Sequence, residues 1–325
     1  PNPEDFTSNA FVIKGLHQAD GWSLEGTFDY FLFENITQGD AAEGVFFGGA
    51  VVNDNIVLEE ERERLRLSLE GSFTPDTPGA LADSFSVRGY YQNAEQRSVN
   101  LQQGTVQFGP PPPMVRDRTN DISYSTESFG IDTQAEKLFA TESTTHLLRY
   151  GIEVSLTNVE NAFTRIDRGM TTTATDRIGM APSEVTRLGV FFHDEISLGL
   201  EEKWVITPGV RFEYYDVSPE NTAAFLARTV VPLTGDSVEA VDYENTAIAP
   251  SLSVLYRWTP EVNSYFTYSR GIRNPSAEEL NGVFTHGADF IVTPNPGLEE
   301  EVSDSFEIGI QGTRERHAFQ LAAFY

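Results

Sequence analysis

The sequence contains no cysteine among its 325 residues, which excludes disulfide scaffolds, cysteine-ligated zinc sites and thiol catalysis. It is also poor in positive charge, because 22 Lys and Arg residues stand against 49 Asp and Glu residues and the formal net charge is −27. A surface of that sign does not neutralise phosphates. We therefore expect no nucleic-acid partner.

Long hydrophobic runs are missing too. No stretch of about 18 apolar residues occurs, so no transmembrane helix is expected. Enzyme motifs are equally missing: there is no Gly-x-Ser-x-Gly, no His-Glu-x-x-His, no phosphate loop and no Rossmann glycine pattern. We expect no enzymatic activity, no catalytic residue and no intrinsic cofactor. With 39% hydrophobic and 12% aromatic residues, however, the chain must form a packed or membrane-bound structure.

Apolar and polar residues alternate along most of the chain, which is the period of a β-strand with two different faces. Trp204, Val210 and Phe212, for example, share one parity, and the polar Lys203, Arg211 and Glu213 share the other. The pattern predicts twelve strands, at 10–17, 22–33, 62–73, 84–92, 121–134, 145–157, 186–198, 203–216, 246–258, 262–271, 302–313 and 316–325.

Short and long connections alternate between these predicted strands. The long ones cover 34–61, 93–120, 158–185, 217–245 and 272–301. Short periplasmic turns that alternate with long external loops are typical of an outer-membrane barrel, whose strands need about 9–11 residues to cross the bilayer. We therefore predict an all-β fold, a transmembrane antiparallel up-and-down β-barrel in which every second side chain contacts outer-membrane lipid.

The predicted barrel is incomplete. The twelve strands take about 27 residues each with their connections, and loops of this length suit plugged barrels of about 22 strands. The chain starts at Pro1 without a Met or a signal peptide. We expect residues 1–325 to be part of one barrel domain, without the plug.

Three segments, in this order, resemble TonB-dependent outer-membrane receptors. They are Phe191–Tyr215 with its Thr-Pro-Gly-Val-Arg core, Tyr265–Leu280 with Ile-Arg-Asn-Pro, and Asn295–Gly309 with Asn-Pro-Gly-Leu. The resemblance implies a barrel closed by a plug, and import driven by the TonB–ExbB–ExbD complex through an N-terminal region outside these residues. Alignment of the loop after 262–271 with the seventh external loop of the family makes the chain strands 4 to 15.

The last two segments form a pair of boxes around one histidine. The first box is Ile272, Arg273, Asn274 and Pro275, and the second is Asn295, Pro296, Gly297 and Leu298. This arrangement resembles the haem and haemoglobin receptor branch, which implies that His286 is an axial ligand of haem iron and that the plug supplies the second. The first box departs from the family's Phe-Arg-Ala-Pro at Ile272 and Asn274, and the second departs from Asn-Pro-Asn-Leu at Gly297.

The sequence thus predicts a Gram-negative outer-membrane receptor that imports an iron-containing ligand, namely haem or a haem protein delivered by a carrier. A ferric-siderophore or cobalamin receptor of the same fold, with His286 a bystander, remains an alternative. A passive porin or a structural barrel is less favoured; it would lack a plug, so the residues upstream of Pro1 decide. An outer-membrane enzyme is also less favoured, because no Ser/His or Asp/His pair can be assigned. The ligand, the host and the oligomeric state are left open.

Other residues have structural interpretations. His193 is expected in a salt-bridge network with Glu195, Arg187 and Arg211 on the lumen face. The acidic run 59–63 is expected at a solvated loop end rather than in a Ca²⁺ site, because turn glycine and carbonyl partners are missing. Trp22, Trp204 and Trp258 are expected in a belt at the bilayer interface.

Overall fold

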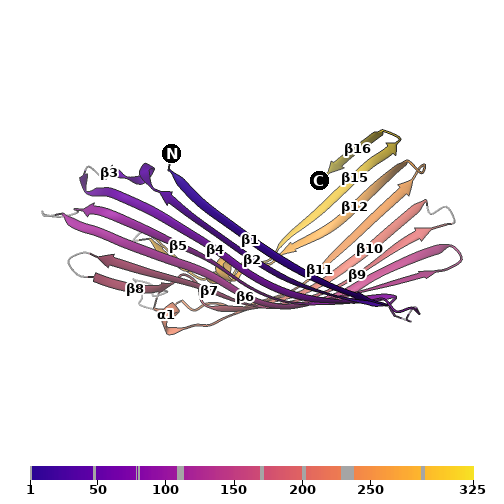
Figure 1. Ribbon diagram of the computed structural model, residues 1–325, viewed down its shortest axis with the longest axis horizontal. Coiled ribbons are helices and arrows are strands. Elements are labelled where there is room, and N and C mark those ends of the chain that lie inside the picture. Colours follow the sequence, from indigo (N-terminus) through magenta and orange to yellow (C-terminus); the bar gives the residue numbers. More distant parts are fainter. Residues whose placement is uncertain are drawn as a thin grey trace.

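The computed structural model describes residues 2–46, 49–77, 79, 81–107, 113–168, 172–199, 203–227, 238–286 and 290–325. Twelve strands follow one another in a single curved sheet, and each pairs antiparallel with its neighbours (Figure 1). They are β1 (Glu4–Ala19), β2 (Trp22–Gln38), β4 (Val51–Phe73), β5 (Ser84–Val106), β6 (Met114–Ala140), β7 (Thr144–Arg168), β9 (Ser183–Leu198), β10 (Trp204–Pro219), β11 (Tyr243–Arg257), β12 (Val262–Arg273), β15 (Glu301–Arg314) and β16 (His317–Phe324). These are the twelve predicted strands, so the antiparallel all-β prediction is confirmed.

The remaining elements lie in the long connections. They are the 3-10 helix η1 (Asp40–Ala42), β3 (Gly44–Phe46), β8 (Thr172–Ile178), α1 (Ala223–Leu226), α2 (Ala277–Asn281), β13 (Phe284–His286) and β14 (Phe290–Val292). β3 pairs with β4 and β8 pairs with β7, whereas β13 and β14 form a separate two-stranded sheet. No helix of the described residues is long and apolar enough to cross a membrane.

The two faces of the sheet differ as the alternation predicts. Leu67 and Leu69 on β4 are 43% and 56% exposed, and both lie on a face of the sheet that is rich in exposed apolar side chains. Arg64, on the other parity of the same strand, donates to Asp29 of β2 at 2.9 Å. We call these the apolar face and the charged face. Their separation fits a wall between lipid and an aqueous interior.

Several strands are much longer than predicted. β4 to β7 contain 23 to 27 residues, so parts of the predicted loops 34–61, 93–120 and 158–185 are strand instead. The acidic run 59–63 lies inside β4, and its assignment to a loop end was wrong. Beyond the bilayer both faces of a strand meet water, so the polar alternation ends while the hydrogen-bonded ladder continues. Ion pairs such as Arg97–Asp121 at 2.6 Å join these extensions.

The sheet is open at both sides in the described residues. β1 pairs only with β2, and β16 pairs only with β15. Figure 1 shows these two strands as separate edges of the curved sheet. The total of about 22 strands and the assignment of strands 4 to 15 stay predictions.

The three tryptophans lie beside short turns, as predicted for an interface belt. Trp22 begins β2, Trp204 begins β10, and Trp258 directly follows β11. Each is 44–60% exposed. Trp204 and Trp258 both contact Tyr256, with ring centroids 4.6 Å apart in each pair. Exposed aromatic rings grouped at one end of the strands are typical of a membrane–water interface.

Candidate functional site

The connection between β12 and β15 folds back onto the sheet and builds the main hydrophobic core. Its helix α2 begins directly after the first box with a capping box, in which Ser276 Oγ accepts from the Glu279 amide and Glu279 accepts from the Ser276 amide. Leu280 of α2 is 1% exposed. It belongs to a cluster with residues of β7, β9 and β10, among them Val159, Val185 and Val217.

Three residues of the first box are tied to this wall. The Tyr215 hydroxyl of β10 donates to the Pro275 carbonyl at 3.1 Å. Asn274 Oδ1 accepts from Asn245 Nδ2 of β11 at 2.7 Å. Arg273 bonds Glu301 of β15 at 3.0 Å and also bonds Glu279 of α2. Together with Ile272, which pairs with Val302, the box is an anchor of the loop.

The second box joins the same structure. The Asn295 amide donates to the carbonyl of Leu280 at 2.8 Å, and the Gly297 amide donates to Asn295 Oδ1 at 3.1 Å. Leu298 packs against the core cluster that contains Leu280, while Pro296 is exposed. We call residues 273–283 and 295–298 the platform. The sequence predicted the two boxes, but it did not predict that they meet.

The platform is also held by a residue that the sequence analysis missed. Asn281 is fully buried. Its Nδ2 donates to the Val241 carbonyl at 3.0 Å, and its Oδ1 accepts from the Val241 amide at 2.7 Å. The side chain thereby joins α2 to the connection between β10 and β11. No sequence pattern marks this asparagine, because its partner is backbone 40 residues away.

His286 lies at the end of a short hairpin that continues from the platform. The Val283 amide donates to the Gly179 carbonyl at 2.7 Å and fixes the base of this hairpin. β13 pairs with β14, and His286 is opposite Phe290 in the register. The side chain of His286 lies outside the described residues, so its role as a haem ligand stays a prediction.

The capping box of the platform favours the ionised form of Glu279. The Ser276 amide first, and Arg273 second, hold the pKa of Glu279 below the ordinary glutamate value of 4.5. Glu279 is therefore negative at neutral pH, and Arg273 remains bound to it. Among the described residues, no group of three or more His, Asp or Glu side chains could hold a metal ion.

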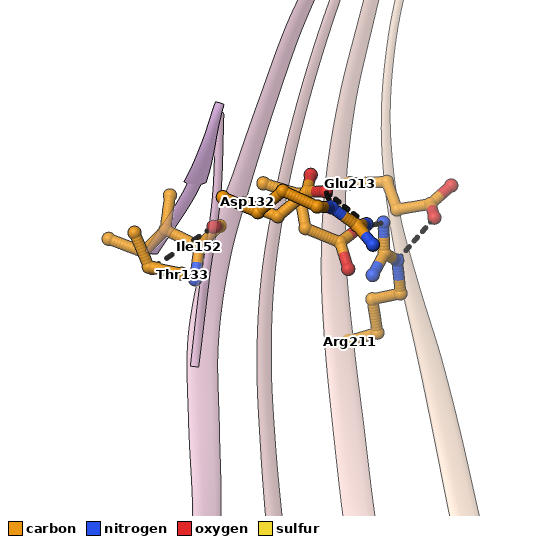
Figure 2. Close-up of polar contacts among 7 residues, drawn as sticks. Asp132, Thr133, Ile152, Arg211 and Glu213 are labelled. Atoms are coloured by element: carbon orange, nitrogen blue, oxygen red, sulfur yellow. Dashed lines mark hydrogen bonds and ion pairs between the residues drawn. The ribbon is translucent and has the colours of Figure 1, made fainter. Parts of the chain in front are cut away.

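A cavity of about 450 Å³ lies beside the platform on the charged face. Ile272, Arg273 and Asn274 of the first box form one side, and charged residues of the wall form the other. Figure 2 shows Arg211 of β10 next to Glu213, several strands away from Thr133 and Ile152. Arg211 bonds Glu153 at 2.7 Å and Glu213 at 2.5 Å.

The wall of this cavity depends on a glycine. Gly189 of β9 lies between Glu153 and Glu213 in the register. A Cβ at that position would clash with the Arg211 guanidinium, which crosses β9 to reach Glu153. Of the predicted network, only Arg211 is ion-paired among the residues that the structure describes, and its partners are Glu153 and Glu213 rather than the predicted Glu195. His193 is not part of it, because in the part of the chain that the structure describes its ring contacts Phe191 and forms no ion pair.

The family model of the TonB-dependent receptor-like β-barrel matches residues 2–325. Among curated proteins, haemoglobin–haptoglobin utilization protein B of Neisseria meningitidis serogroup A is 24% identical over 138 residues, which are 41% of this chain and 16% of that protein. The ferric preacinetobactin receptor BauA from Acinetobacter baumannii has a TM-score of 0.58 at 11% identity, over 99% of this chain and 46% of that chain. The copper transporter OprC has a TM-score of 0.61 at 11% identity, over 99% and 52%.

The chain therefore spans about half the length of these solved structures. At such low identity the structural likeness shows the fold alone. The family prediction made from the sequence is confirmed, and so is the expectation of a non-enzyme. The chain belongs to the TonB-dependent receptor-like β-barrel family, the transport receptors of the bacterial outer membrane.

Proposed function

We propose that this chain is the wall of an importer that captures haem or a haem protein outside the cell. The observation that carries the proposal is the platform, in which both boxes join through α2 and support the hairpin of His286. The likeness to a protein named for haemoglobin–haptoglobin utilization supports the same ligand class. Haem is here the cargo, and no resident cofactor is needed.

The proposal requires His286 to act as a ligand of haem iron. A neutral imidazole nitrogen can ligate ferric haem iron. A ligand on a short hairpin with a fixed base keeps its orientation, which lowers the entropic cost of ligation. The net charge of −27 repels bare anions at long range, so capture relies on ligation, aromatic contact and contact with a carrier protein.

The remaining machinery belongs to the same proposal. The family implies import driven by the TonB–ExbB–ExbD complex, which would act through a plug that also supplies the second axial ligand. If these residues are strands 4 to 15, the complete reading frame should contain a domain of roughly 130–150 residues before them. A frame that encodes no such domain would instead favour a passive or structural barrel.

The test is a haem titration of the full-length receptor in detergent. His286→Ala should shift the Soret band and weaken haem binding, whereas His193→Ala, which changes a histidine of the wall, should leave both unchanged. An unchanged spectrum together with unchanged haem uptake in His286→Ala removes the haem assignment. It would favour the alternative, a ferric-siderophore or cobalamin receptor.

A further inference from the structure

Arg187 of β9 lies on the charged face and lines the same cavity as the first box. Its guanidinium carbon is 5.2 Å from the ring centroid of Tyr215. The hydroxyl of that same tyrosine donates to the Pro275 carbonyl at 3.1 Å. The arginine is thus tied to the box through one aromatic ring.

The other cations of this cavity already have carboxylate partners. Arg211 is bound by Glu153 and Glu213, and Arg273 is bound by Glu301 and Glu279. Asp132, an acid of the cavity wall, is bound by Arg88. Arg187, by contrast, has no ion-pair partner among the residues that the structure describes. Arg187 is thus a lining cation of the cavity whose charge no described carboxylate neutralises, in a chain whose net charge is −27.

The geometry of Arg187 suits a carboxylate. The guanidinium carbon of Arg187 lies over the ring of Tyr215, and this cation–π contact restrains the group without using its N–H donors. Such a fork matches the two oxygens of a carboxylate and can bind them with two parallel hydrogen bonds.

A second donor group lines the same cavity. Asn274 uses its Oδ1 to accept from Asn245, so the two N–H groups of its Nδ2 are left for another acceptor. This asparagine replaces the alanine that is usual in the box of the family. An amide at that position gives the cavity a polar group that an alanine would not supply.

We propose that Arg187 and Asn274 form a subsite for a carboxylate of the transported ligand. This inference rests on the proposed function, under which the carboxylate is a propionate of haem. The subsite would receive the acidic edge of the ligand while iron ligation takes place elsewhere. Its effect on affinity should therefore be separable from the effect of His286.

The experiment compares ferric haem with its dimethyl ester, in which both carboxylates are neutral. Full-length receptor in detergent is titrated with each probe. A charge-assisted bond in a partly hydrated cavity should make the wild type bind haem about tenfold more tightly than the ester. Arg187→Gln should abolish this preference by weakening haem binding about tenfold without changing ester binding. Arg187→Lys should retain part of the preference, and Asn274→Ala should reduce it severalfold.

The controls separate this inference from the proposed function. His286→Ala should change the Soret band with both probes, whereas Arg187→Gln should leave its position unchanged. Arg149→Gln is a matched control, because Arg149 lies on the charged face outside the cavity and is bound to Glu136 at 2.8 Å. It should keep the full preference for haem over the ester.

Equal effects of Arg187→Gln on the binding of haem and of the ester would overturn the subsite and leave the haem assignment standing. They would indicate that Arg187 binds a carboxylate from another part of the receptor. If the wild type binds neither probe, the haem assignment fails, and the subsite is judged by cellular uptake of ferric citrate, a carboxylate-rich iron complex. A severalfold lower uptake with Arg187→Gln supports the subsite. Any other result with ferric citrate overturns it.

Discussion

Asn281→Ala should lower the free energy of local opening of the platform more than the substitution of an exposed asparagine with the same kind of bonds. The substitution removes the side-chain partners of the Val241 amide, at 2.7 Å, and of the Val241 carbonyl, at 3.0 Å. Asn281 itself has 0% exposure, and Val241 is half-buried. Each buried polar group left without a partner costs about 1–3 kcal/mol. We expect a total of about 3 kcal/mol for local opening, since water from the cavity side replaces part of the loss.

Hydrogen exchange of the full-length receptor measures this change directly. The Val241 amide and the amides of α2 should exchange on the order of a hundredfold faster in Asn281→Ala. Strand amides of β6 and β7 should be unaffected, because the change is confined to one connection. Haem affinity should fall in parallel, since the hairpin of His286 continues from the same segment.

Asn221→Ala is the matched control. Its side chain bridges the neighbouring peptide in the same way, with Oδ1 accepting from the Ala240 amide at 2.7 Å and Nδ2 donating to the Ala240 carbonyl at 3.3 Å. Asn221 is exposed, however, so water can replace it at a cost of about 1 kcal/mol, or about fivefold in exchange. Equal acceleration in the two variants would refute the reasoning from burial.

The remaining predictions concern a strand end and pH. Gly104→Ala should destabilise the end of β5 by about 2 kcal/mol, because Gly104 has a φ of +157° and a Cβ would clash with the Val52 carbonyl. Gly89→Ala on the same strand, where a Cβ meets nothing within 4 Å, should be nearly neutral. A heat-modifiability assay measures the unfolding midpoint of each variant, and equal midpoints for the two variants would contradict this prediction. Because the pKa of Glu279 is lowered in the folded state, its contribution to α2 is complete above pH 4.5 and is lost as the pH falls through the lower folded pKa. Protection factors of α2 should drop over that range in the wild type but not in Glu279→Gln, whose amide keeps the bond to Ser276.

Much of the sheet could be predicted from the sequence, because lipid on one side and water on the other impose alternation on each crossing strand. All twelve strands of the main path were found this way. The extensions of β4 to β7 were not found, since both faces of a strand beyond the bilayer meet water and the alternation disappears. The run 59–63 illustrates this, because five charged residues in succession continue a strand whose hydrogen bonds are made by the backbone.

The site could be predicted only in part, for a related reason. The two boxes stand out as motifs, and the anchoring of Arg273 by carboxylates follows from simple charge. Their union depends on contacts between residues far apart in the chain, such as the Tyr215 hydroxyl with Pro275 and the Asn281 amide with Val241. Bonds from side chains to backbone carry no pairing signal in one sequence, so the platform became visible only in the structure.

The most direct test of the account is a measurement of the iron ligands in the loaded receptor. Full-length protein labelled with ¹⁵N-histidine and loaded with ferric haem is studied by pulsed electron paramagnetic resonance, which detects coupling between the iron spin and ligating imidazole nitrogens. The account predicts a ¹⁵N coupling from His286 in the wild type, which is lost in His286→Ala and persists in Arg187→Gln. A coupling that survives the loss of His286 unchanged would contradict the role proposed for the platform.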